Sequence, residues 1–245
     1  MPKFFEVLDE NIVNQFSGIL VVGDVHGNIE AFTNAVNYAT EQNLYIVSLG
    51  DLPDYGLHSK EVINLAKTLY DEKRISIILG NHERKIHKWA IQSSEGHVRI
   101  TIKPSIQVTI DSFGDDKVAI NNFMTLYSDM VNIIKYKNVY FTHGALHKDI
   151  LVKPEYTPIA YQYALFGEID PHAPKRESGY PNRIYSWVKH IPDDLTVYVG
   201  HDIRDFTAPF VDGSVCFIDT GSSKEGFLSG AVLNTDGTLI EYRKF

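Results

Sequence analysis

The chain has 245 residues, of which 44% are hydrophobic and 22% charged, so wholesale disorder is excluded and one domain with a full core is expected. The formal net charge of −8 argues against a broad, non-specific nucleic-acid-binding protein, because such proteins neutralise many phosphates with Lys and Arg. The single cysteine, Cys216, excludes an intrachain disulfide. The first residues lack the apolar stretch of a signal peptide, and we expect a cytoplasmic protein with no membrane partner.

The first part of the chain alternates short apolar runs with helical patterns. Buried strands are expected at residues 18–22, 44–49 and 75–79. Helices are expected near residues 29–39, at 59–70 with Ser59 as the N-cap, and from about His82. Continuous β-branched strands separated by helices predict a parallel sheet that is covered on both faces.

This alternation stops between residues 93 and 137. Residues 118–135 have the pattern of a helix, whereas the segment around Pro104 permits either a strand or a helix. We therefore expect one domain, residues 1–245, with a small and mostly helical cap at 93–137 inserted beside the functional site.

The last part of the chain is rich in short strand patterns. They lie at residues 139–142, 195–199, 208–211, 215–218, 228–233 and 239–242. Asp212-Gly213 and Asp236-Gly237 are typical of hairpin turns. The predicted fold class is α/β, a sandwich of two sheets flanked by helices, in which the antiparallel ending forms a second sheet against the first.

Five predicted strands end in a glycine beside a residue that can bind a metal ion. The segments are Gly23-Asp24-Val25-His26-Gly27, Gly50-Asp51, Gly80-Asn81-His82, His143-Gly144 and Gly200-His201. A single Gly-Asp is more often a turn and a single Asn-His a helix cap, but five such sites in order are not explained in that way. Carboxylate oxygens and imidazole nitrogens together suit manganese, iron, zinc, nickel or cobalt better than calcium.

These segments resemble the motifs of the calcineurin-like metallophosphoesterases, in their phosphoprotein-phosphatase branch. Here the motifs are GDVHG, GDLPDYG, GNHE, HG and GHD, in the family's order. Three further segments, YALFGE, YPNRIYSW and VCFIDTG, resemble the phosphatase module of bacterial polynucleotide kinase-phosphatases.

The resemblance implies a centre with two divalent transition-metal ions, manganese before nickel, iron, zinc or cobalt. The implied ligands are Asp24 and His26 for the first ion, Asp51 bridging both, and Asn81, His143 and His201 for the second. A metal-bridging hydroxide would attack phosphorus, and His82, oriented by Asp54, would protonate the leaving oxygen.

One position departs from the family pattern. Tyr55 stands where the family has an arginine that grips phosphate, and tyrosine lacks the bidentate guanidinium fork. Arg183 and Arg84 are the remaining candidates for a phosphate contact, and Tyr55 itself is a candidate for substrate binding. Asp219 is expected to stabilise the metal ligands without binding a metal ion itself.

The leading hypothesis is a phosphatase acting on nucleotides or on RNA or DNA ends, including 2′,3′-end phosphates. A protein Ser/Thr or Tyr phosphatase and a dinucleoside-polyphosphate hydrolase stay open as alternatives, because all three reactions use the same centre. A metal-binding scaffold without activity is the non-enzymatic alternative. The sequence shows neither a P-loop nor a KxDG ligase motif, so kinase or ligase partners in end repair would be separate proteins.

Overall fold

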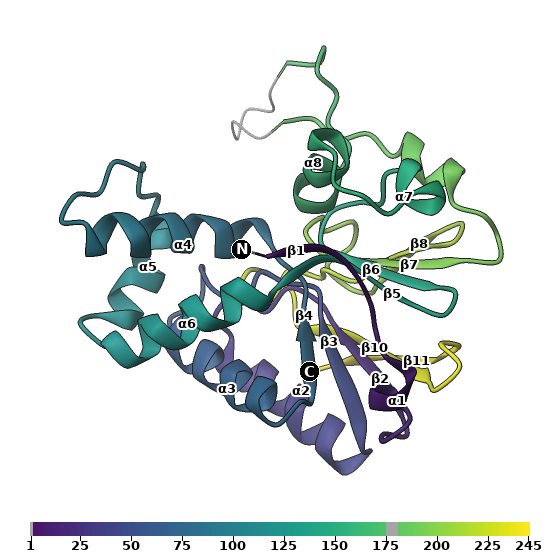
Figure 1. Ribbon diagram of the computed structural model, residues 1–245, viewed down its shortest axis with the longest axis horizontal. Helices are drawn as coiled ribbons and strands as arrows, with labels where there is room; N and C mark the ends of the chain where they lie inside the picture. Colours follow the sequence, from purple (N-terminus) through teal and green to yellow (C-terminus); the bar gives the residue numbers. More distant parts are fainter. Residues whose placement is uncertain (1, 175–180) are drawn as a thin grey trace.

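The computed structural model describes residues 2–174 and 181–245, which form two mixed β-sheets packed face to face (Figure 1). The six-stranded sheet has the order β1-β5-β6-β7-β9-β8 and the five-stranded sheet the order β11-β10-β2-β3-β4. The strands are β1 (Lys3–Val7), β2 (Gly18–Val22), β3 (Leu44–Ser48), β4 (Ile75–Ile77), β5 (Val131–Tyr136), β6 (Val139–Thr142), β7 (Thr196–Val199), β8 (Phe210–Asp212), β9 (Val215–Phe217), β10 (Ser229–Asn234) and β11 (Leu239–Lys244).

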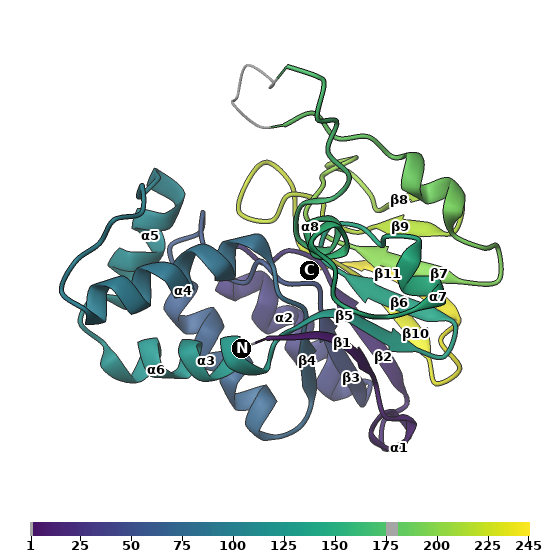
Figure 2. The ribbon, with the colours of Figure 1, turned by 45° about the horizontal axis from the view of Figure 1, so that its top comes forward.

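Helices cover the outer face of each sheet. These helices are α2 (Ile29–Glu41), α3 (Ser59–Asp71), α4 (Asn81–Ser94), α5 (Pro104–Phe113), α6 (Lys117–Asp129), α7 (Asp149–Val152), α8 (Pro158–Phe166) and the 3₁₀ helix η1 (Ser186–His190). The short α1 (Glu10–Val13) instead packs Val13 into the core between the sheets. Helices α2 to α6 lie on the side of the five-stranded sheet, while α7, α8 and η1 lie on the six-stranded sheet (Figure 2). The predicted α/β fold with two sheets flanked by helices is confirmed. Of the helices described, none is both long enough and apolar enough to pass through a membrane.

The central strands are buried on both faces. In β2, Ile19 and Val21 point into the core between the two sheets, while Leu20 and Val22 pack under the helices. Successive side chains of a strand alternate between faces, so a strand that is apolar throughout has to be covered twice. This explains why β2 and β3 have continuous apolar sequences.

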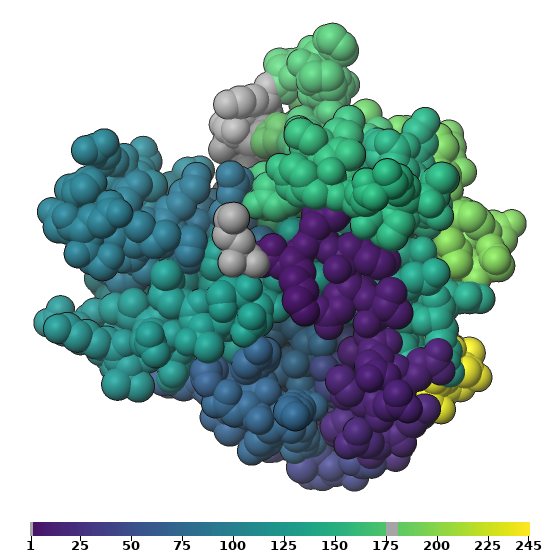
Figure 3. Space-filling view, viewed as in Figure 1, coloured from purple at the N-terminus to yellow at the C-terminus, as the bar shows by residue number. Residues whose placement is uncertain are grey.

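The helix predicted for residues 118–135 is wrong in its last part. Helix α6 ends at Asp129, Met130 turns into extended backbone, and Val131–Tyr136 form β5 inside the six-stranded sheet. Pairing with β1 on one side and β6 on the other outweighs the local helical pattern. The segment around Pro104 is a helix, α5, and α4 to α6 protrude on one side of the molecule (Figure 3).

Three smaller predictions also differ from the structure. Strand β1 was not expected, and the antiparallel ending does not form one sheet, because β8 and β9 join the six-stranded sheet while β10 and β11 join the other. Ser59 is not the N-cap of α3, which is His58. The Ser59 hydroxyl instead accepts a hydrogen bond from the backbone N–H of Asp54 at 3.1 Å.

Candidate metal centre

The candidate ligands come from the carboxyl ends of strands in both sheets. Asp24 and His26 follow β2, Asp51 follows β3, and Asn81 is the first residue of α4 after β4. From the other sheet, His143 follows β6 and His201 follows β7. The strands within each group are parallel, so their carboxyl ends meet at one edge of the sandwich.

Two groups of donor atoms share one carboxylate. The ligand atoms of Asp24, His26 and Asp51 lie within 4.8 Å of one another, and so do those of Asp51, His143 and His201. Asn81 adds an amide oxygen 3.2 Å from His143 Nε2. These clusters are consistent with a binuclear metal site in which Asp51 belongs to both halves, and the structure thus brings all six predicted ligands together.

The backbone at these ligands is in an unfavourable conformation. His26, Asp51 and His201 have φ angles of 50°, 50° and 64°, in the left-handed region that side chains with a Cβ rarely adopt. Glycines make room for the same carboxylates, since a Cβ on Gly80 would lie 2.2 Å from Asp51 Oδ1 and one on Gly200 would lie 2.2 Å from Asp24 Oδ1. Strain of this kind persists where the surroundings fix the conformation, as at functional sites.

Hydrogen bonds fix which nitrogen of each histidine ring faces the site. His26 Nδ1 lies 3.1 Å from the carbonyl oxygen of Pro53, and His143 Nδ1 lies 2.8 Å from that of Leu49. A carbonyl only accepts, so both Nδ1 atoms carry a hydrogen, and in the neutral ring the lone pair is then on Nε2. Histidine ligands in metal sites are commonly held in this way.

The electrostatics of the buried acids also fit bound cations. Burial and the charge of Asp219 raise the pKa of Asp24 well above its ordinary value. Burial opposes the protonation of His143, but Asp51 and Asp24 outweigh it and raise the pKa of His143 to about 10. Asp219 is 2% exposed, and its Oδ2 has no hydrogen-bond partner in the part of the chain described. Divalent cations would neutralise this concentration of buried carboxylates.

The predicted acid and its orienting carboxylate are in contact. His82 Nδ1 lies 2.5 Å from Asp54 Oδ2, and His82 Nε2 lies 3.8 Å from Asp51 Oδ2, on the side of the metal ligands. The other oxygen of Asp54 accepts a hydrogen bond of 2.6 Å from the hydroxyl of Thr109, which lies on α5. Lys85 Nζ lies 3.4 Å from His82 Nε2.

A cavity of about 340 Å³ opens over these residues. Two of the predicted substrate-binding residues, Tyr55 and Arg183, line it, and Arg84 is not among the described residues that do. Arg183 donates to Asp202 Oδ1 at 2.7 Å and to His201 Nε2 at 2.6 Å. The same lone pair of His201 would bind a metal ion. The YPNRIYSW segment, which contains Arg183, is described from Pro181 onward.

Besides Thr109, Lys224 and Glu83 were not predicted as residues of this site. Lys224 lines the cavity, with its ammonium group 4.6 Å from the centre of the Tyr55 ring, and no motif marks it. Glu83 is fully buried and accepts hydrogen bonds from the backbone N–H groups of Asp51 and Leu52 at 3.1 and 2.6 Å. Burial and the charge of Asp51 raise the pKa of Glu83 to about 8. Its place in the GNHE motif was the available signal.

The chain is similar to proteins of known activity over most of its length. It is 27% identical over 218 residues to the bis(5′-nucleosyl)-tetraphosphatase PrpE [asymmetrical] of Oceanobacillus iheyensis, an alignment that covers 82% of either chain. It is 23% identical over 198 residues to the protein of the same name from Anoxybacillus flavithermus, covering 74% of this chain and 77% of the relative.

Solved structures show the same fold. A crystal structure of a candidate diadenosine tetraphosphatase matches with a TM-score of 0.67 and 19% identity, covering 99% of this chain and 98% of the other. A protein serine/threonine phosphatase of Saccharomyces cerevisiae matches with a TM-score of 0.61 and 15% identity, covering 99% and 83%. The family model for calcineurin-like phosphoesterases matches residues 18–211. The chain is a phosphoester hydrolase and belongs to the calcineurin-like phosphoesterase family.

Proposed function

We propose that this protein is an asymmetrical dinucleoside tetraphosphatase, which adds water to one phosphoanhydride bond and releases a nucleoside triphosphate and a nucleoside monophosphate. The observation that carries the proposal is the activity that names the PrpE proteins of Oceanobacillus iheyensis and Anoxybacillus flavithermus, which align with about three quarters or more of this chain and of their own length. These relatives favour the dinucleoside-polyphosphate alternative over polynucleotide ends, and the resemblance to polynucleotide kinase-phosphatases gains no support from them. The likeness to protein phosphatases is one of fold.

The charges around the cavity support a substrate with several adjacent phosphates. Arg183 and Lys224 line the cavity, and Lys85 lies beside His82. Asp51 and Asp202 line the same cavity and Arg183 pairs with Asp202. A phosphate chain could contact more of the three cationic side chains than a single phosphate could. Tyr55, in place of the family's arginine, adds an aromatic ring to the same wall.

The chain's own residues have separable roles. Asp24, His26, Asp51, Asn81, His143 and His201 would hold two divalent cations, which suit this set of oxygen and nitrogen donors. When bound, such ions neutralise phosphate charge and activate water. Arg183 and Lys224 would bind non-reacting phosphates. His82, held by Asp54, would give its Nε2 proton to the leaving oxygen.

The nature of the leaving group sets how much the acid contributes. The leaving oxygen of an anhydride belongs to a phosphate, whose second pKa is about 6, so it needs less protonation than an alkoxide. We therefore expect His82 to matter less for tetraphosphates than for alkyl phosphate esters.

The test is a substrate panel with the manganese-loaded protein. Diadenosine tetraphosphate, 3′-phosphate RNA, 2′,3′-cyclic-phosphate RNA and a phosphopeptide are compared by kcat/KM, and the products are separated by ion-exchange chromatography. We expect ATP and AMP in equal amounts and the highest kcat/KM on the tetraphosphate. Asp51→Asn should be inactive, and the exposed Asp149→Asn should be fully active. Release of two ADP molecules, or a higher kcat/KM on RNA ends, would refute the proposal.

A further inference from the structure

A second cavity, of about 620 Å³, lies beside the metal centre. It is formed where the start of β1, helices α4 and α6, strand β5 and helix α8 meet near the N-terminus (Figures 1 and 2). Six of the residues that line it are Phe4, His87, Tyr127, Asn132, Tyr156 and Tyr161.

Aromatic rings form much of the wall of this cavity. The His87 ring stacks on the Tyr127 ring, with centroids 3.7 Å apart and an angle of 9° between the planes. Tyr156 contacts Phe4 and Tyr161, with centroids 5.5 and 5.7 Å apart, although 59% of Tyr156 is exposed. Planar aromatic surfaces of this kind stack with nucleobases.

One of the residues that line the cavity is a buried asparagine. Asn132 is 2% exposed and lines the cavity, and its Nδ2 has no hydrogen-bond partner among the residues described. An unpaired buried donor costs about 1–3 kcal/mol, so it marks a place where a bound molecule would supply the acceptor. A ring nitrogen or an exocyclic oxygen of a nucleobase provides such an acceptor.

Helix α4 contributes residues to both cavities. Asn81 lines the metal-centre cavity and His87 the second one, and Arg84 lies one helical turn from each, so the three residues follow one another along the helix surface. The rise from Asn81 to His87 is about 9 Å along the helix axis. The Arg84 guanidinium lies 5.8 Å from the centre of the Tyr161 ring, at the second cavity.

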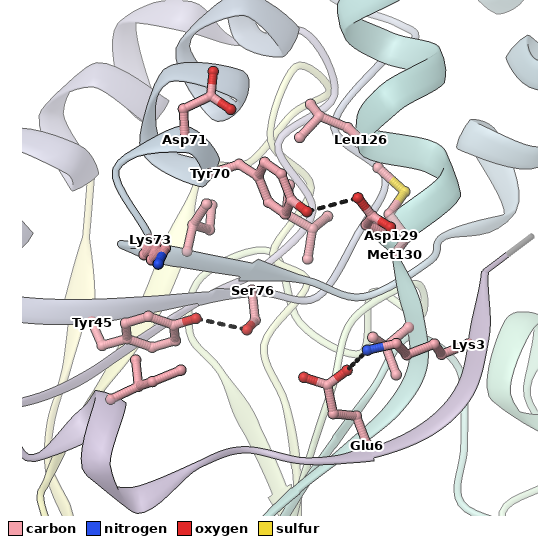
Figure 4. A pocket seen from close by; sticks show the side chains of 14 residues that line it. Lys3, Glu6, Tyr45, Tyr70, Asp71, Lys73, Ser76, Leu126, Asp129 and Met130 are labelled. Carbon is pink, nitrogen blue, oxygen red and sulfur yellow. Dashed lines mark hydrogen bonds and ion pairs between the residues drawn. The ribbon is translucent and has the colours of Figure 1, made fainter.

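A third cavity, of about 390 Å³, serves as a comparison, because its polar side chains form hydrogen bonds and ion pairs with one another (Figure 4). There the Tyr70 hydroxyl bonds Asp129 at 2.7 Å, and Lys3 pairs with Glu6 at 2.9 Å. These groups satisfy one another. The second cavity differs because no described residue provides a hydrogen-bond partner for the Nδ2 of Asn132.

From these observations we infer that the aromatic cavity binds the second nucleoside of a dinucleoside polyphosphate whose phosphate chain spans from the metal centre past Arg84. The base stacks on the tyrosine and histidine rings and accepts a hydrogen bond from Asn132 Nδ2. Arg84, which does not reach the metal-centre cavity, neutralises a phosphate on the way. This inference rests on the proposed function.

The first test compares diadenosine tetraphosphate with adenosine 5′-tetraphosphate, which has the same phosphate chain and one nucleoside fewer. In the manganese-loaded wild type, we expect a lower KM for the dinucleotide. Asn132→Leu should raise that KM roughly 5–10-fold, as loss of one hydrogen bond does, and leave the KM of adenosine 5′-tetraphosphate unchanged. Tyr156→Ala changes an exposed position that is not needed for folding, and it should change the two KM values in the same way. This variant provides the test if Asn132→Leu does not fold.

The matched control is Asn122→Leu, which removes an amide that bonds Asn64 at 2.9 Å on the same side of the protein, outside both cavities. It should leave both KM values unchanged. Equal KM values for the two substrates in the wild type, or parallel changes for both in Asn132→Leu and Tyr156→Ala, would overturn the inference.

A binding measurement separates this inference from the proposed function. Adenosine has no phosphate with which to occupy the metal centre, so saturation-transfer NMR with adenosine reports on the aromatic cavity even if the tetraphosphate is not hydrolysed. We expect signals of equal strength with wild type and Asn122→Leu and a clearly weaker signal with Asn132→Leu, in line with the loss of affinity of roughly 5–10-fold. Signals of equal strength with all three proteins, or with none of them, would overturn the inference.

Discussion

Thr109 offers a sharp test of how the helical segment α4–α6 supports the reaction. Its hydroxyl donates to Asp54 Oδ1 at 2.6 Å and accepts from the Asp54 N–H at 2.9 Å. A hydroxyl has one hydrogen, so Ser59, whose Oγ lies 3.0 Å from Thr109 Oγ1, must be the donor in that pair. Asp54 uses its other oxygen for His82. Thr109→Val keeps the shape of the side chain and removes both contacts with Asp54.

Two magnitudes follow from these contacts. A hydrogen bond to a carboxylate contributes about 1.5–3 kcal/mol, and the Asp54 N–H keeps its 3.1 Å contact with Ser59 Oγ. We expect Thr109→Val to lower the unfolding free energy by about 1–2 kcal/mol, which is a fall in Tm of about 2–8 °C for a chain of this length. A freer Asp54 orients His82 less well, so kcat on poor leaving groups should fall roughly 10–100-fold.

The assay is a series of phosphate esters whose leaving groups differ in pKa, with KM, kcat and bound manganese measured for each variant. The loss of kcat should grow with leaving-group pKa, while KM and metal content stay constant. Thr109→Ser should restore most of the rate. Ser112→Ala is the control, because Ser112 lies on the same helix and accepts from the Lys60 N–H at 3.0 Å without touching Asp54. If the loss were the same for all leaving groups, or equal in Ser112→Ala, the reasoning would be refuted.

Further changes should act on the metal centre. Asp51→Asn should lower manganese-dependent hydrolysis at least 10³-fold, a rough figure for losing a shared ligand, and near-normal turnover would remove its bridging role. His82→Ala should keep its metal, measured by elemental analysis, and lose about 10²–10⁴-fold in kcat on alkyl esters but less on tetraphosphates; equal losses would exclude it as the acid. Chelation should lower Tm by about 5–10 °C, because ligand at 100 times its Kd contributes about 2.7 kcal/mol, and an unchanged Tm would argue against a structural metal contribution. In the metal-free protein the pKa of His143 is raised to about 10 and that of Glu83 to about 8. A group with a raised folded-state pKa loses its stabilising contribution between its unfolded and its folded pKa. Stability should therefore fall between about pH 4.5 and 8 through Glu83 and between about pH 6.5 and 10 through His143, by about 1 kcal/mol per pH unit for each group in denaturant titrations. A rise over these ranges would contradict the assignment.

Much of the site could be predicted because its signals are local. The apolar runs of β2 and β3 are buried on both faces, as expected in a parallel sheet, and each is followed by a glycine that lies close to neighbouring backbone: Gly23 next to Ile218 and Gly50 next to Ile78. Each ligand can therefore be recognised from its own short sequence segment. Parallel pairing brings the strand ends of one sheet to one edge, whereas only the folded chain shows that the edges of the two sheets meet.

The failures have a physical reason as well. Residues 131–136 form a strand because β1 and β6 flank them. Strand β6 follows directly in a hairpin, but β1 lies at the start of the chain, far away in sequence. The helical pattern that precedes them gives no sign of this pairing. Lys224 and Thr109 reach the site from segments without any motif, so only the folded chain shows that they contact Tyr55 and Asp54.

The conformation of Tyr55 bears on why the family's arginine could be replaced. Asp54 and Tyr55 have φ angles of 75° and 64°, so the loop keeps two consecutive left-handed residues, at a cost of about 1–3 kcal/mol each. The bonds of Asp54 to Thr109, Ser59 and His82 hold this loop independently of residue 55. The side chain at position 55 is therefore free to change with the substrate while the acid pair stays in place. Tyr55 lines the cavity, and the ammonium group of Lys224 lies over the face of its ring. An aromatic ring beside a cation would suit a substrate that carries both phosphates and bases.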